Sequence, residues 1–182
     1  MFSPTYRNIW SVSWPLIIAG ISETVVEVTD AIFLARYGLT ELAALGLAGA
    51  IYGLALFASY GLVDAIQIVI GRRVGQGDNP GVGRSFNQGL YLLAIVSVLM
   101  IALIWFVLPL FTREMLASAD VHRAVNDYLR VAAFGLLFHA ANLAYSAFYV
   151  GISRTRVLIG ATLVLAVVNI LLDYALIFGH FG

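Results

Sequence analysis

The sequence predicts an all-α fold, a polytopic bundle of transmembrane helices. Of its 182 residues, 62% are hydrophobic and only 11% are charged, and the mean hydropathy is +0.95. Water-soluble domains are about 45–50% apolar and about 25% charged, so a soluble fold could not bury this much apolar surface. In addition, apolar stretches long enough to cross a bilayer, about 20 residues or more, recur along the whole chain.

Each apolar stretch is interpreted as one membrane-spanning helix, which gives five expected spans. They cover residues 9–34, 42–70, 86–111, 131–152 and 157–177, with short polar linkers between them. The first stretch is expected to be retained rather than cleaved as a signal peptide, because it contains Pro15 and Glu23 and lacks a small-residue cleavage site. Gly49 and Gly53, one helical turn apart in the second span, predict close helix packing there.

The orientation is predicted from the arginines, since cytoplasmic loops are enriched in basic residues. Six of them belong to the N-terminal segment and to the second and fourth linkers: Arg7, Arg72, Arg73, Arg84, Arg154 and Arg156. The remaining four lie in the other two linkers, where acidic residues offset them. We therefore expect a cytoplasmic N-terminus in an inner or plasma membrane.

Composition also argues against several function classes. The chain has no cysteine, and its three histidines lack the spacing of metal ligands. No basic block with interleaved aromatic residues indicates nucleic-acid binding. No nucleophile–base pair or phosphate-binding loop can be assembled from the sequence, so we expect neither an enzyme nor a cofactor.

Carboxylates within the predicted spans are the strongest functional signal. A carboxylate near the bilayer centre costs about 2.5–3.5 kcal/mol on insertion scales, so such residues are candidates for ion or substrate sites. In the first span Glu23, Glu27 and Asp30 recur at helical spacing and share one face. In the last span Asn169 and Asp173 are one turn apart, and Asp173 lies at about the depth of Asp30. These positions predict a shared site; the alternative is that interhelical hydrogen bonds satisfy the polar groups without any cargo.

Two further polar residues share a face of the fourth span. They are His139 and Asn142, three residues apart and close to mid-membrane. For His139 we favour a hydrogen-bonded packing role.

Several motifs resemble the multidrug and toxic compound extrusion (MATE) family, part of a wider superfamily of drug, lipid-linked oligosaccharide and polysaccharide exporters. They are Pro15 followed by the run from Asp30 to Gly38, the segments 43–48, 71–78, 127–130 and 151–156, and the run from Asn169 to Gly179. The resemblance implies two six-helix lobes facing a central cleft. It also implies cargo efflux driven by inward movement of protons or sodium.

The resemblance further implies roles for individual residues. Asp30, Asn169 and Asp173 match a cation-coupling site inside the N-terminal lobe, and Asn142 is similar to a polar site residue of the fourth helix. Glu23 and Glu27 depart from the family, which usually has an uncharged polar and a small or apolar residue at these positions. We expect both glutamates to attract cationic cargo.

The expected function is secondary active efflux of small cationic or amphipathic drugs or toxins in antiport with protons or sodium. Carboxylate and amide oxygens suit either ion, so the residue types leave the coupling ion open. The expected partners are the small-molecule cargo, membrane lipids, and a sixth helix and C-terminal lobe beyond these five spans. One alternative is a lipid-linked-oligosaccharide flippase or polysaccharide exporter, although no arginine lies mid-span to line a cationic cleft. The other is a non-transporting membrane scaffold.

Overall fold

The computed structural model describes residues 5–115 and 118–177, and these residues form helices and contain no strand. The order is α1 (Tyr6–Tyr37), α2 (Leu39–Gly75), α3 (Asn79–Ala102), the π-helical turn η1 (Leu103–Val107), α4 (Leu108–Met115), α5 (Ala119–Gly151) and α6 (Arg156–Ile177). The predicted all-α class is confirmed.

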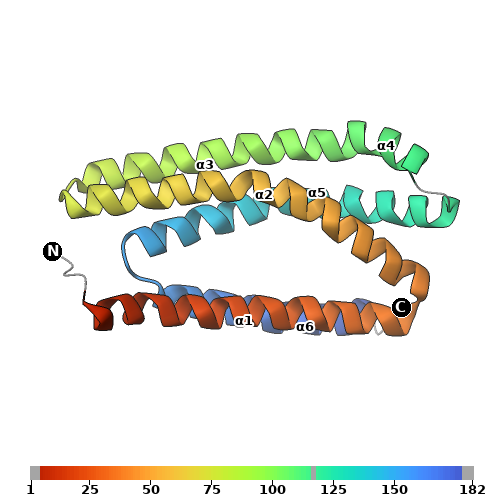
Figure 1. Ribbon diagram of the computed structural model, residues 1–182, viewed down its shortest axis with the longest axis horizontal. Coiled ribbons are helices and arrows are strands. Elements are labelled where there is room, and N and C mark those ends of the chain that lie inside the picture. The colour runs from red at the N-terminus through yellow and green to blue at the C-terminus, as the bar shows by residue number, and fades with distance from the viewer. Residues whose placement is uncertain (1–4, 116–117, 178–182) are drawn as a thin grey trace.

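The helices form two layers (Figure 1). In one layer α1 and α6 pack along each other, and in the other α2, α3 and α5 pack together. Both clusters of buried apolar residues belong to the three-helix layer, one around Val125 and Leu129 and the other around Ile70 and Leu93. A single residue, Gly38, separates α1 from α2, so the chain passes directly from one layer to the other. The core therefore lies in the three-helix layer.

Four helical segments of the described chain are long and apolar enough to cross a membrane. They are Leu45–Gly75, Asn79–Glu114, Ala119–Gly151 and Arg156–Leu176. The helix α1 has a comparable length but carries Glu23, Glu27 and Asp30 in its apolar stretch. α1 packs along α6, which is one of these four segments. That α1 crosses the membrane as a fifth span stays a prediction.

The helices extend beyond the apolar windows, so the linkers are shorter than the sequence suggested. Only residues 76–78 separate α2 from α3, where a linker over 71–85 was expected. Likewise α5 begins at Ala119 rather than near residue 131, and the Ser118 hydroxyl accepts a hydrogen bond from the Val121 N–H at 3.4 Å. Hydropathy marks the part of a helix that lies in hydrocarbon, whereas the helix continues wherever its ends are capped.

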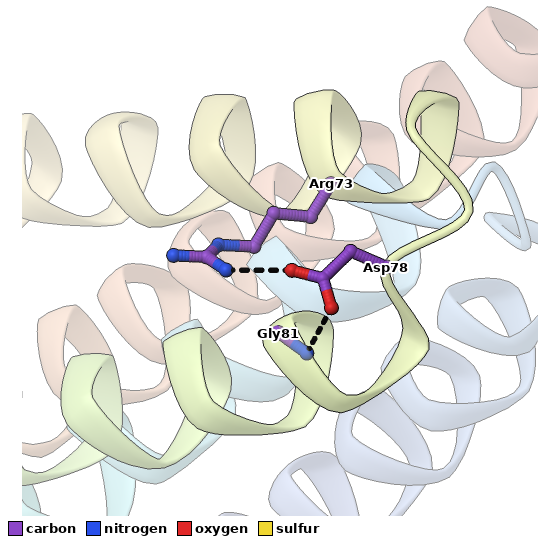
Figure 2. A network of polar contacts seen from close by, with 3 residues as sticks. All are labelled: Arg73, Asp78 and Gly81. Atoms are coloured by element: carbon purple, nitrogen blue, oxygen red, sulfur yellow. Dashed lines mark hydrogen bonds and ion pairs between the residues drawn. The ribbon is translucent and has the colours of Figure 1, made fainter.

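The turn between α2 and α3 is held by one carboxylate (Figure 2). Asp78 caps α3 by accepting the Gly81 N–H at 3.0 Å, and its other oxygen pairs with the Arg73 guanidinium at 2.8 Å. A Cβ at residue 81 would collide with the Asp78 carboxylate, and Gly77 has a φ of 72°, so two glycines are required here. The Gly81 N–H and the Arg73 guanidinium hold the pKa of the Asp78 carboxyl below its usual value.

Close helix packing occurs at other glycines than those predicted. A Cβ at Gly89 would lie 2.6 Å from Ile66 Cδ1, and one at Gly151 would lie 2.6 Å from Ile70 Cγ2. At Gly49 and Gly53 no atom lies within 4 Å of such a Cβ. The predicted packing role of Gly49 and Gly53 is therefore wrong for the contacts of this chain, because these glycines lie on a face of α2 that no neighbouring helix approaches closely.

Candidate functional site

The structure brings Asp30, Asn169 and Asp173 together at the contact between α1 and α6. With its amide oriented to satisfy both carboxylates, Asn169 Nδ2 lies 3.1 Å from Asp30 Oδ1 and 3.1 Å from Asp173 Oδ2. An amide nitrogen has two N–H groups, so Asn169 can donate to both acids at once. Asp30 is far in the sequence from Asn169 and Asp173, and the packing of α1 on α6 makes them neighbours.

The two carboxylates thus lie close together, because each has an oxygen 3.1 Å from the same Asn169 amide nitrogen. Two carboxyl groups share a hydrogen bond only when one of them carries a proton, because ionised oxygens are acceptors alone. Beside them the rings of Phe33 and Tyr174 meet edge to face, with centroids 6.5 Å apart. The cluster can therefore hold a proton between two oxygens, or present several oxygens to a hard cation.

A tyrosine from the other layer faces this cluster. Tyr128 of α5 lies close enough to Asp30 and Asp173 to interact with their charges, and Tyr52 of α2 lies within electrostatic range of Tyr128. Sequence analysis missed Tyr128 as a neighbour of the site. No spacing signal could have revealed it, because the relation depends on how the two layers face each other.

The remaining acids of α1 face α2. Glu23 and Glu27 are exposed in this chain, and Tyr60 of α2 lies close enough to both to interact with their charges. The Tyr60 ring meets the exposed ring of Phe57 edge to face, with centroids 5.9 Å apart. Two carboxylates thus lie opposite an aromatic pair, next to the helix face that carries Asp30.

The other two polar candidates lie away from the cluster. Asn142 is exposed and makes no hydrogen bond within the described part of the chain. It is 14 residues from Tyr128, or about 21 Å along α5. The buried Nε2 atom of His139 likewise has no hydrogen-bond partner among the described residues, so the expected hydrogen-bonded role of His139 is not supported.

Comparison with known proteins identifies the family. A family model described as MatE matches residues 15–175, most of the chain. The chain belongs to the MatE family. Its curated relatives include proteins named "Probable multidrug resistance protein NorM" from Rhizobium meliloti, 29% identical over 92% of this chain, and from Pseudomonas syringae, 27% identical over 97%. The chain spans 36% and 39% of the length of these two MatE relatives.

Solved structures support the MatE fold. A structure described as a MOP superfamily transporter from Pyrococcus furiosus superposes with a TM-score of 0.90 at 23% identity. Another, described as MATE in the bent conformation, superposes with a TM-score of 0.87 at 23% identity. Each match covers 96% of this chain and 39% of the solved chain. Together with the apolar helices, these similarities make the chain a multi-pass membrane protein with the fold of MatE transporters.

Proposed function

We propose that the chain forms part of a cation-coupled efflux transporter and that Asp30, Asn169 and Asp173 are its coupling site. The single observation that carries the proposal is the Asn169 amide between the carboxylates of two different helices. No arginine lies in this stretch of either helix to neutralise the pair. Carboxylates in a membrane are costly unless they titrate, bind a cation or pair, and an ion-coupling role accounts for their presence here.

The geometry favours a proton as the coupling ion. With Asn169 donating its amide N–H groups to both acids, its Oδ1 is turned away from them, whereas a sodium ion at the cluster would be held by the amide and carboxylate oxygens together. Losing the proton leaves two like charges at close range, which changes the packing of α1 on α6. That change is the proposed link between ion movement and the populations of the inward-open and outward-open states.

The test measures gradient-driven efflux from vesicles that contain the full product of the gene. Asp30→Asn and Asp173→Asn are each expected to abolish efflux while membrane expression stays normal. Asn169→Ala is expected to be milder, because it removes a hydrogen-bond donor and no charge. Asp64→Asn is the matched control, since Asp64 is an exposed span carboxylate on α2 and should tolerate the change.

Collapse of the proton gradient should stop efflux, and collapse of the sodium gradient should not. Efflux that stopped when the sodium gradient collapsed, and continued without a proton gradient, would show that the same residues couple efflux to sodium. Wild-type efflux by both aspartate variants would refute the site, and the residues would revert to packing roles.

We further propose that the cargo is cationic and is attracted by Glu23 and Glu27. Two exposed carboxylates opposite Tyr60 and Phe57 offer both charge attraction and an aromatic face to a lipophilic cation. Glu23→Gln and Glu27→Gln are expected to weaken resistance to cationic dyes several-fold and to leave resistance to neutral drugs nearly unchanged. Equal loss for both kinds of compound would point to a folding role for the glutamates.

The proposed transport function also implies partners and a location for the whole protein. We propose an inner or plasma membrane with the N-terminus in the cytoplasm, and further helices that complete the cleft, in line with the longer relatives. The proposed activity is transport and not enzymatic catalysis, and no cofactor is invoked.

A further inference from the structure

Six arginines lie toward one end of the molecule, Arg7 near the start of α1 and five others in or beside two turns between helices. Figure 1 shows the α2–α3 turn and the α5–α6 turn at the same end as the start of α1. Arg72 and Arg73 lie at the end of α2 and Arg84 near the start of α3, on either side of the first turn. Arg154 lies in the second turn, and Arg156 is the first residue of α6. We call this set of five the basic end.

Close packing of α2 against α5 holds the two turns beside each other. A Cβ at Gly71 would lie 3.6 Å from the Gly151 carbonyl oxygen, and one at Gly151 would lie 3.2 Å from the Gln67 carbonyl oxygen. A Cβ at Gly151 would also lie 2.6 Å from Ile70, which is fully buried, so glycine is required at residue 151, whereas the 3.6 Å at Gly71 is ordinary van der Waals contact. The basic end is therefore a composite surface built by two segments that are distant in the sequence.

Most of the positive charge of the basic end is uncompensated. The ion pair between Arg73 and Asp78 is the one salt bridge found among residues 5–115 and 118–177. Asp78 is also the single acid in residues 71–85 and 151–156. The other four arginines are exposed and have no ion-pair partner in the described chain.

The position of these arginines along the helices sets the depth at which they meet the membrane. Arg72 lies in the last turn of the apolar segment Leu45–Gly75, and Arg156 opens the segment Arg156–Leu176. Arg84 lies five residues into Asn79–Glu114, about 7.5 Å along the helix, within the reach of a side chain that extends toward the headgroups. Because they lie at the ends of apolar segments, the guanidinium groups are expected at the level of lipid phosphates.

We propose that the basic end binds the headgroups of anionic phospholipids. Guanidinium groups pair with phosphate in a bidentate geometry and carry their charge at all physiological pH values. A rigid surface with four unpaired arginines attracts an anionic leaflet, whereas a zwitterionic leaflet offers no net charge to it. The role is independent of cargo efflux, so it stands whether or not the proposed coupling site is correct.

The experiment uses native mass spectrometry to measure the binding of phosphatidylglycerol and phosphatidylcholine. The protein is the full product of the gene, purified in detergent. Phosphatidylglycerol is expected to bind at least tenfold more tightly. Each arginine removed should weaken phosphatidylglycerol binding about fivefold, so Arg154→Gln/Arg156→Gln should lose most of the preference. Arg72→Gln/Arg84→Gln, beside the other turn, should give a similar loss.

The matched control is Arg113→Gln/Arg123→Gln, two exposed arginines on α4 and near the start of α5. Figure 1 shows α4 at the end of the molecule opposite the α2–α3 turn. This variant should keep the full preference. Equal loss in the control variant, or no preference in the wild type, would overturn the proposal. Inorganic phosphate should compete only weakly, and competition at the concentration at which the lipid binds would show a free-anion site instead of a lipid surface.

Discussion

Gly151 and Ile70 make one of the closest contacts between helices α5 and α2. A Cβ at residue 151 would lie 2.6 Å from Ile70 Cγ2 and 3.0 Å from Ile70 Cβ, well inside van der Waals contact. Ile70 is fully buried and branched at Cβ, so its methyl group cannot rotate away. Gly151→Ala is therefore expected to destabilise the fold by about 1–2 kcal/mol, at the lower end of overpacking effects.

A double-mutant cycle separates this clash from other effects of the substitution. Ile70→Ala alone should cost about 2–5 kcal/mol through lost burial and a cavity. In the double variant the methyl group introduced at residue 151 enters that cavity, so the loss should fall short of the additive value by about 1–2 kcal/mol. The assay is unfolding in mixed micelles of increasing SDS content, followed by circular dichroism.

Gly83→Ala is the control for intrinsic helix propensity. Gly83 lies inside α3 and has no neighbour within 4 Å of a Cβ, so alanine there should be neutral or stabilise by about 0.5–1 kcal/mol. If Gly151→Ala were as stable as the wild type, or if the two substitutions were strictly additive, the close approach of α2 and α5 would be wrong.

Two further predictions concern the ends of the helices. The pKa of Asp78 lies below its usual value, so its capping contribution should be complete above about pH 4 and be lost as the pH falls through the lower folded-state pKa. Hydrogen exchange of the first turn of α3 should show this loss in the wild type, whereas Asp78→Ala should be less protected at neutral pH and show no such step. For topology, cysteines replacing Arg36 and Asp120 should react with an impermeant thiol reagent in intact cells, and one replacing Gln76 should not. Reversed labelling would invert the proposed orientation.

Much of the fold followed from one-dimensional patterns. Apolar runs of span length located the helices, because every backbone polar group in a bilayer must be satisfied internally. Helical spacing put Glu23, Glu27 and Asp30 on one face, and matched depth on a second helix put Asp173 at the level of Asp30. Both inferences depend only on helix geometry, and the structure brings Asp30 and Asp173 together around the Asn169 amide.

What the sequence left open depends on how helices face one another. Gly49 and Gly53 have the spacing of a packing motif but no close neighbour, whereas the isolated Gly89 and Gly151 do have one. Small residues permit close approach without requiring it, so spacing alone cannot select the glycines that pack. For the same reason Tyr60 and Tyr128 were not predicted as neighbours of the acids, since each lies in the other layer.

The distribution of buried residues bears on how the proposed coupling site would act. Both apolar core clusters lie in the three-helix layer, so that layer resists deformation. The α1–α6 pair holds the acidic cluster and is joined to the other layer by Gly38 and by residues 152–155, where Ser153 has a φ of 58°. A change in the charge of Asp30 and Asp173 therefore acts on the contact between α1 and α6, whose packing includes few fully buried side chains. Because Glu23 and Glu27 lie on α1, any shift of α1 that follows moves these carboxylates relative to Tyr60. The proposed coupling site and the proposed cargo site thus share one helix, α1.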